Sequence, residues 1–597
     1  MKRLSACLSI LLISSLVPAF AAEKTVKPIV AIYSLEGPLS ESGQGQAELM
    51  DLTFEASRPL TMLELSRSLE KALSDAAVRA VVVDADKASL DFSQIQEIRK
   101  LLLALRGAGK DVWIYSEHLS SRTALLGSAA NHFTLMPEGD CDFHGLYSES
   151  MYFKDLLDKL GVKADVIHIG DFKSYGENYY RTGPSEAALK QEEKLIDSIY
   201  GQIVENVASG RKLTKEQVQA IIDDGALTPR RAVEAKLADD LMYRTDLVKK
   251  LQETYGKDAV FDRKYELPDL EGPEITGMMD VFKLMFSAAN KGKFRSDFIA
   301  VVALDGDITE ESIAPVRTQI LKLAKEEKAK ALVLRVNSPG GSALASEVLW
   351  EATDEWNATG KPFIVSMGGV AASGGYYVSS SAKRIFAEAG TITGSIGVVG
   401  MKFVIGNAME KIGITTHTIQ RGKNAGAMSM MHGFTEEEAK LMRESMTEVY
   451  RTFKKRVTDG RGKALKGDLE SLAGGRVYSG KDALEIGLVD EIGGIHDAIA
   501  YAAQEAKLEN PEVKLLPEPK SGLEGMFSTQ QNKDDDEILR APAGPDASLK
   551  LRALLKNSGV FETLPEPAKS EVNRLISRMQ AFRKTQVLLI GPDLNLN

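Results

Sequence analysis

The chain contains 597 residues, of which 44% are hydrophobic and 26% are charged, a composition typical of globular proteins and not of disordered or fibrous chains. At about 150 residues per domain, this length predicts roughly four domain-sized units. The 84 Asp and Glu residues outnumber the 74 Lys and Arg residues, and the net charge of −10 argues against a nucleic-acid partner, which requires a basic surface. Two cysteines exclude a disulfide framework and a zinc site built from cysteines.

The N-terminus has the pattern of a secretory signal. Lys2 and Arg3 precede an apolar run over residues 4–20, and small residues that suit signal cleavage follow it. The run is short for a membrane-spanning helix, which needs about 20 apolar residues. We therefore expect residues 1–21 to be a signal peptide that is cleaved after Ala21, with an uncleaved membrane anchor as the alternative. Both outcomes predict an exported protein.

The interior of the chain contains two similar halves. Residues 29–37 resemble residues 298–306, and residues 160–162 resemble residues 412–414 at a separation of 252 positions. In each half, short β-branched runs alternate with amphipathic stretches such as residues 94–106. Strands that alternate with helical patterns indicate βαβ units with a parallel sheet. The sequence thus predicts a tandem repeat of two α/β domains.

The remaining chain divides into four parts after the signal segment. They are an N-terminal α/β repeat over residues 22–265, a linker over 266–295, a C-terminal α/β repeat over 296–510 and an extension over 511–597. In the linker, residues 278–286 are apolar enough for a packed helix. The extension is expected to be loosely ordered and to end in a helix over 568–583 and a short strand over 587–590.

Three glycine-rich segments of the second half suit a site of chemistry. Residues 337–341 (Asn-Ser-Pro-Gly-Gly) follow an apolar strand, so their glycine N–H groups can face a cavity at the carboxyl edge of the sheet, where an oxyanion hole or a phosphate site is often built. Residues 371–375 (Ala-Ala-Ser-Gly-Gly) place Ser373 at the start of a helical pattern, which favours nearby negative charge. Residues 393–397 (Thr-Gly-Ser-Ile-Gly) form the third segment. Each segment on its own is equally well explained without a catalytic role, as a tight turn or as a serine that caps a helix.

In this order and spacing, the three segments resemble the signal peptide peptidase A family, also called protease IV, of Ser/Lys peptidases. The resemblance extends over about residues 29–510 and matches the long form of the family, with two tandem repeats. It implies the Clp protease/crotonase type of α/β fold in both halves. It also implies hydrolysis of cleaved signal peptides and other unfolded or membrane-released peptides, in the periplasm or on the periplasmic face of the inner membrane.

The resemblance also assigns roles to residues. The nucleophilic serine of the family corresponds to Ser373. Its general-base lysine, found in a Gly-x-x-Lys-Ser segment of the first half, corresponds to Lys173. The expected oxyanion hole combines the N–H of Gly374 with that of Gly340 or Gly341.

Ser395 is expected to hydrogen-bond the amine of Lys173, with a plain turn serine as the alternative. A lysine with an ordinary pKa of about 10.4 is a base near neutral pH only if burial lowers that pKa by several units. A strand over residues 164–169 that carries Lys173 into an interface would provide this burial. The main rival is Lys423, which we expect at the surface.

The two halves retain complementary parts of one site. A shift of 252 positions relates Lys173 to Ala425, and Ser373 to Ser121, which has no glycine neighbours. One whole site therefore requires both halves, which must meet head to tail. Such contacts propagate until a ring closes, so we expect several chains in a ring, a tetramer by resemblance, with one active site per chain.

Other chemistries remain as alternatives. His432 is the histidine that could replace the lysine as the base, whereas His168 and His417 lie in strand-like alternation and suit packing. The fold also serves acyl-CoA enzymes, in which glycine N–H groups hold a thioester enolate, and it could form an inactive scaffold. No sequence pattern suggests a metal site or a nucleotide loop, so no cofactor is predicted.

Overall fold

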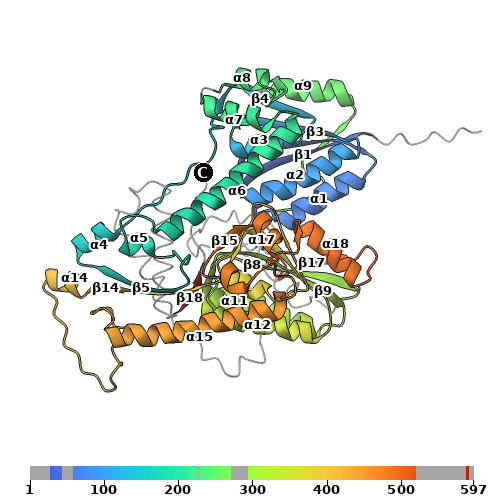
Figure 1. The fold of residues 1–597 in the computed structure, drawn as a ribbon. Helices are drawn as coiled ribbons and strands as arrows, with labels where there is room; N and C mark the ends of the chain where they lie inside the picture. Colours follow the sequence, from blue (N-terminus) through green and yellow to red (C-terminus); the bar gives the residue numbers. More distant parts are fainter. Residues whose placement is uncertain (1–26, 44–57, 226, 271–293, 519–586, 591–597) are drawn as a thin grey trace, which may run out of the picture.

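The computed structural model describes residues 27–43, 58–225, 227–270, 294–518 and 587–590. The predicted signal segment and the predicted helices over 278–286 and 568–583 lie outside these residues. Two α/β units and a sheet that joins them make up the described chain (Figure 1).

The first unit is built on a six-stranded sheet in the order β6-β4-β3-β2-β1-β7. All neighbouring strands in it are parallel. The central strands contain short buried apolar runs, such as residues 80–83 of β2, because helices cover both faces. The elements are β1 (Ile29–Pro38), α1 (Met62–Ser74), β2 (Val78–Ser89), α2 (Phe92–Gly107), β3 (Asp111–Leu119), α3 (Ser121–Gly127), β4 (His132–Cys141), α6 (Glu186–Arg211), α7 (Lys215–Asp224), α8 (Pro229–Glu234), β6 (Asp240–Leu241), α9 (Arg244–Tyr255) and β7 (Val260–Asp262).

The second unit repeats this architecture with strand order β15-β13-β11-β9-β8-β17, β12 beside β11, and β16 beside β12. Its strands are parallel except for the pair β13–β15. The predicted tandem repeat of parallel-sheet domains is therefore confirmed. The elements are β8 (Phe298–Asp305), α11 (Glu310–Lys325), β9 (Ala329–Ser338), α12 (Ala343–Ala358), β11 (Phe363–Ala372), α13 (Gly374–Ser379), β12 (Arg384–Ala387), β13 (Ile392–Gly394), α15 (Glu436–Arg461), α16 (Leu469–Leu472), β15 (Val477–Ser479), α17 (Gly480–Ile486), β16 (Glu491–Ile492), α18 (Ile495–Glu505) and β17 (Glu512–Leu516).

A third, antiparallel sheet joins the units in the order β10-β18-β14-β5. Strand β5 (Lys163–Ile169) of the first half pairs over its whole length with β14 (Val398–Val404) of the second half. Between β10 (Gly340–Ser342) and β14 lies β18 (Leu588–Ile590), the strand expected at the end of the chain. Three short helices flank this sheet: α4 (Lys154–Leu160), α5 (Glu177–Tyr180) and α14 (Gly406–Lys411).

One repeat position breaks the symmetry of the halves. Residues 415–421 correspond to β5, but they form neither helix nor strand, and all of them are exposed, including His417. The sequence interpretation of His417 as a packing residue in strand-like alternation is therefore wrong. Figure 1 shows the connection from α14 to α15 extending away from both units. An isolated segment with strand-like sequence needs a partner edge to become a strand.

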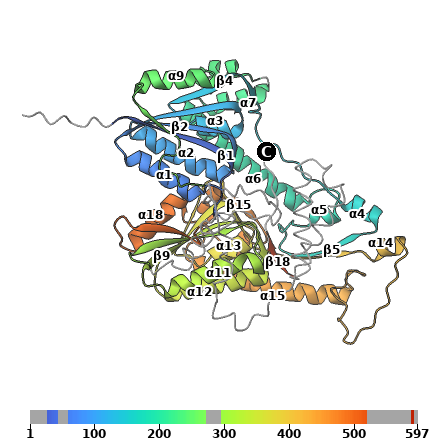
Figure 2. The same cartoon turned by 180° about the vertical axis from the view of Figure 1, so that it is seen from behind.

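A buried charge cluster ties the two units together. The guanidinium of Arg335 on β9 lies 2.8 Å from a carboxylate oxygen of Glu41 and 2.6 Å from one of Glu97 on α2, and its side chain is 1% exposed. Helix α1 contacts α18, and Figures 1 and 2 show these two helices side by side from opposite directions. Helix α2 contacts β11. The halves are thus held by polar and apolar contacts distant in sequence.

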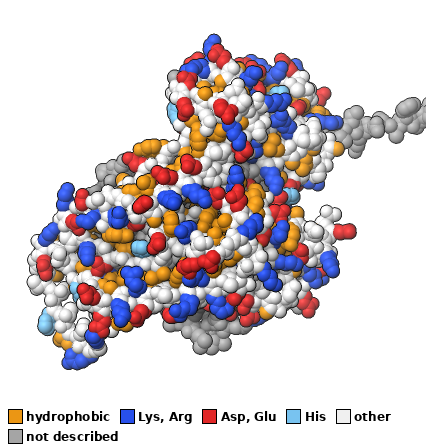
Figure 3. Space-filling view, viewed as in Figure 1, with side chains coloured by type: hydrophobic (Ala, Val, Ile, Leu, Met, Phe, Trp, Pro, Cys, Tyr) orange, Lys and Arg blue, Asp and Glu red, His pale blue; other side chains and the backbone are white. Residues whose placement is uncertain are grey.

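Two further observations concern the surface. On the face drawn in Figure 3, acidic and basic side chains are intermixed. Among the residues with described positions, no helix combines the length and the apolar character that crossing a membrane requires.

Candidate active site

Ser373 stands at the junction of β11 and α13, in the N-cap position of that short helix. Its side chain makes no capping hydrogen bond, so the usual role of a serine at this position does not apply. Its backbone has φ 53° and ψ −111°, a conformation that residues other than glycine rarely adopt and that clusters at functional sites. The N–H of Ser373 donates to the carbonyl of Gly394 at 2.8 Å, which fixes this turn against β13.

Lys173 of the first unit reaches this serine. Its Nζ lies 2.7 Å from the Oγ of Ser373, 2.9 Å from the Oγ of Ser395 and 3.1 Å from the carbonyl oxygen of Ser395. Ser395 follows β13 and also has a positive φ, of 53°. The structure therefore brings together three residues that the sequence analysis selected from opposite halves.

The three side chains share a dry environment. Lys173 is 2% exposed, whereas Ser373 and Ser395 are 0% exposed. Burial lowers the pKa of Lys173 well below its usual value, because the ammonium form would lose its hydration without gaining a charged partner. The neutral amine has a lone pair that can accept a hydroxyl proton. This arrangement has the parts of an activated nucleophile.

The chain holds Lys173 through β5 and through a segment of the second unit, residues 474–476, that the sequence analysis did not select. The N–H of Phe172 donates to the carbonyl of Gly474 at 2.9 Å. A Cβ at Gly475 would lie 2.5 Å from the amide nitrogen of the lysine, so only glycine permits this close approach. The N–H of Ser395 donates to the carbonyl of the third residue of the segment at 2.6 Å. The sequence signal that could have identified this segment is its pair of consecutive glycines just before β15.

The amides expected to form an oxyanion hole lie next to the serine. Gly374 begins α13, and an N–H at the start of a helix has no partner within that helix. Its nitrogen lies 2.7 Å from the position that a Cβ of Gly340 would occupy. The N–H of Gly340 donates to the Oγ of Ser338 at 3.1 Å, and Gly341 lies opposite Leu589 of β18.

The rival residues lie elsewhere. His432 is exposed, and its Nδ1 lies 3.0 Å from the carbonyl oxygen of the next residue, Gly433. Lys423 is exposed and pairs with Glu437. In the position equivalent to Ser373, Ser121 has its Oγ 3.4 Å from the carbonyl oxygen of Gly145.

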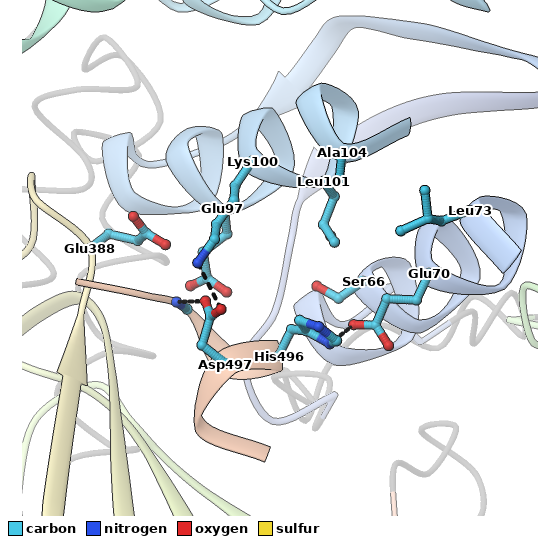
Figure 4. A pocket seen from close by; sticks show the side chains of 11 residues that line it. Ser66, Glu70, Leu73, Glu97, Lys100, Leu101, Ala104, Glu388, His496 and Asp497 are labelled. Carbon is cyan, nitrogen blue, oxygen red and sulfur yellow. Dashed lines mark hydrogen bonds and ion pairs between the residues drawn. The ribbon is translucent and has the colours of Figure 1, made fainter. Parts of the chain in front are cut away.

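A cavity of about 390 Å³ lies apart from these residues, between α1, α2 and α18 (Figure 4). Its wall includes Glu97 and the nearly buried Glu388. One carboxylate oxygen of Glu388 has no hydrogen-bond partner, and burial raises the pKa of this residue to about 8. No residue of the predicted site lines this cavity, which instead lies at the junction of the two units.

Fold and site together fit the class of serine hydrolases: the buried Ser373 of the second unit lies beside the buried Lys173 of the first. Residues 104–258 and 355–509 each match peptidase family S49, and these matches cover more than half of the chain. The chain belongs to peptidase family S49. It is a serine peptidase of this family with two tandem domains, and the acyl-CoA enzyme and the inactive scaffold are not favoured.

Curated relatives agree with this assignment. Protease 4 of Salmonella typhi is 32% identical over 75% of this chain and 72% of its own length. The chloroplastic serine protease SPPA of Arabidopsis thaliana is 30% identical over 85% of this chain and 74% of its own length. A putative signal peptide peptidase SppA of Enterococcus faecium is 36% identical over 33% of this chain and 57% of its own length. Among solved structures, a ClpP1 mutant from Listeria monocytogenes has a TM-score of 0.23 at 17% identity, covering 33% of this chain and 94% of its own.

Proposed function

We propose that the chain is an endopeptidase in which Ser373 is the nucleophile and Lys173 the general base. The observation that carries this proposal is the 2.7 Å separation of Nζ and Oγ in a site where burial keeps the lysine pKa low. No histidine makes a hydrogen bond to Ser373 in the described part of the chain, which leaves the lysine as the adjacent base.

The geometry supports a two-stage reaction. The Oγ of Ser373 attacks the carbonyl carbon of the scissile peptide bond while its proton moves to the Nζ of Lys173. The oxyanion that forms accepts hydrogen bonds from the N–H of Gly374 and from that of Gly340 or Gly341, each worth about 3 kcal/mol of barrier. The C–N bond then breaks as the lysine gives its proton to the leaving amine.

The acyl-enzyme ester is hydrolysed by the same groups. Water attacks the ester carbonyl and gives a proton to the Nζ of Lys173, which returns it to the Oγ of Ser373 as the acyl product leaves. Ser395 is a positioning residue in this scheme, because its side-chain and carbonyl oxygens hold the amine beside the nucleophile. These steps require no cofactor.

The proposed pair is tested with two variants and one reagent. Ser373→Ala and Lys173→Met should each remove peptide hydrolysis, and both should melt at nearly the temperature of the wild-type protein. A fluorophosphonate probe should label the wild-type chain on Ser373, as located by peptide mass spectrometry. Substantial hydrolysis by the lysine variant would reject the pair and redirect attention to His432.

The proposed substrates are cleaved signal peptides and other unfolded or membrane-released peptides. The name of the Enterococcus relative, a putative signal peptide peptidase, supports this class, and so does the N-terminal segment that predicts export to the periplasm or its side of the inner membrane. Digestion of a peptide library, with synthetic signal peptides included, would define the cleavage preference. N-terminal sequencing of native protein should find Ala22 first, whereas a chain that retains residues 2–20 would be membrane-anchored.

The proposed assembly is a ring of several chains, with a tetramer expected. Within a chain, β5 pairs with β14. The repeat places residues 415–421 and 146–152 in the equivalent positions, and here both lack a strand and carry exposed apolar side chains. Ile419 is 79% exposed and Met151 is 62% exposed. Residues 415–421 of one chain can therefore pair with residues 146–152 of the next, which repeats the internal junction between chains.

This ring has a direct test. Ile419→Asp should yield smaller particles than the wild-type protein in light scattering, while the junction within each chain stays intact. Lys423→Asp, at a nearby exposed position, is the matched control and should preserve assembly. Equal particle mass for all three proteins would contradict this interface.

A further inference from the structure

The proposed nucleophile is inaccessible in this structure. Ser373 is 0% exposed, and the adjacent Lys173 is 2% exposed. A peptide bond must approach within about 3.5 Å of a nucleophile before it can react. A part of the chain that now covers the serine must therefore leave before a substrate can bind.

Strand β18 lies next to the turn that carries the serine. It pairs antiparallel with β10 on one side, with Gly341 opposite Leu589, and with β14 on the other side, where Val399 lies opposite Leu588. The N–H of Ala343 also donates to the carbonyl of Val587 at 3.2 Å. An extended peptide that adds a strand to exposed sheet edges is a recurrent mode of peptide binding. In this sheet β14 lies between β18 and β5, the strand that leads to Lys173.

The backbone of β18 lies beside the proposed oxyanion donors. The carbonyl oxygen of Leu589 lies 2.0 Å from the position that a Cβ of Gly340 would occupy, and the nitrogen of Gly374 lies 2.7 Å from the same position. A Cβ at Gly374 would in turn lie 3.1 Å from the carbonyl oxygen of Leu589. A substrate carbonyl requires this same space.

The two leucine side chains of β18 are buried in apolar clusters on opposite faces of the strand. Leu588 is 1% exposed and belongs to an apolar cluster with Tyr175, Tyr179 and Met401. Leu589 is 0% exposed and belongs to the separate core cluster of the second unit. Successive side chains of a strand point to opposite faces, so two adjacent leucines fill two different pockets. Backbone and side chains thus match the groove together.

Resting on the proposed function, we propose that β18 is an autoinhibitory strand that occupies the peptide-binding groove of its own chain. Peptide substrates compete with it for the edges of β10 and β14. Hydrolysis then requires β18 to leave, and the fraction of chains with an empty groove sets the apparent affinity for substrate. Removal of β18 should lower KM and leave kcat unchanged, because the strand blocks binding and takes no part in the chemistry.

The test compares two truncated chains with the full chain. One chain ends at Gln586 and lacks β18, and the matched control ends at Pro592 and keeps it. Against a short peptide substrate, the first should show kcat/KM at least tenfold above the full chain, while the control should equal the full chain. The rate at which a fluorophosphonate labels Ser373 should rise in parallel.

A full-length variant and a peptide complete the design. Leu589→Asp in the full chain should reproduce the gain, so the result does not depend on the folding of a truncated protein. A synthetic peptide of residues 585–592 should inhibit the chain that ends at Gln586 competitively, and a version with aspartate in place of both leucines should not.

The outcomes separate the two proposals. Equal labelling and equal kcat/KM in the full chain, the truncated chain and the Leu589→Asp variant would overturn autoinhibition and leave the catalytic pair intact. Failure of the unmodified peptide to compete would also overturn it. Absence of labelling on Ser373 in every chain would instead reject the proposed nucleophile, and the autoinhibitory role with it.

Discussion

Residues 163–173 and residues 415–425 occupy equivalent positions in the two halves and have opposite fates. The first segment forms β5, which pairs with β14, and its Lys173 is only 2% exposed. Over the second segment no residue is buried, and residues 415–421 form no strand. The difference lies in the partner edge: β14 lies beside the first segment, and no described strand of the same chain lies beside the second. A strand and a buried lysine are thus found in the segment that has a partner edge.

The largest expected effect contrasts a lysine from each segment. Lys173→Met should lower kcat/KM by about a thousandfold or more, because loss of the base leaves the serine hydroxyl unactivated. Lys423→Met removes an exposed lysine of the other segment and should change kcat/KM by less than about twofold. Steady-state peptide hydrolysis measures both. Similar losses in both variants would mean that burial at the junction does not define the base.

The second effect concerns stability at equivalent positions of the two sheets. Arg335→Met leaves the carboxylates of Glu41 and Glu97 buried without a cation, and it should lower the free energy of unfolding by about 3–5 kcal/mol. The equivalent residue of the first half is Asp84, which pairs with Arg244 near the surface. Asp84→Asn should cost less than about 1 kcal/mol. Denaturant titration of both variants measures whether the free energy of unfolding falls more for Arg335→Met than for Asp84→Asn.

The third effect concerns Ser395. Ser395→Ala removes the 2.9 Å contact with the lysine amine but keeps the carbonyl contact at 3.1 Å. The kcat/KM should fall about tenfold, and its dependence on pH should shift, because the amine loses a partner that orients it. A purely structural role would change the melting temperature and leave the pH profile in place.

The smallest effect concerns Glu388, at the cavity between the units (Figure 4). Burial raises its pKa from 4.5 to about 8, so the folded protein retains a proton that the unfolded chain releases between these pH values. The free energy of unfolding contributed by this group therefore falls as the pH rises through that window. Glu388→Gln should raise the melting temperature by roughly 2–4 °C at about pH 9 and by less at about pH 5. An equal change at both pH values would contradict the assigned ionisation.

The sequence predicted the layers of the fold because buried parallel strands contain continuous apolar runs, such as residues 331–334 within β9. It also pointed to Ser373, Lys173 and Ser395, through the glycine-rich segments and the resemblance to a peptidase family. A further clue was that each half lacks the residue that the other retains. It did not predict the contact of β18 with β10, because pairing between positions so distant in the chain leaves no local pattern.

Two other features escaped prediction for related reasons. Residues 474–476 contribute backbone carbonyl groups and the close approach of a glycine to the site, and neither Gly474 nor Gly475 has a side chain that would mark it as functional. The ion pairs of Arg335 join residues hundreds of positions apart, and a single arginine in an apolar strand does not identify its partners. Residues 415–421 have strand-like sequence and lack the edge that would make them a strand.

The central claim is that one active site forms from both halves of the same chain. Mixing Ser373→Ala protein with Lys173→Met protein, under conditions in which mass spectrometry shows exchanged subunits, tests it most directly. Because Lys173 and Ser373 lie 2.7 Å apart within one chain, each mixed assembly should contain only defective pairs, and hydrolysis should stay at the level of the separate variants. Recovery of activity toward a quarter of that of the wild-type protein, the share of intact pairs expected after random exchange of equal amounts, would show that the pair forms between chains and would contradict the account.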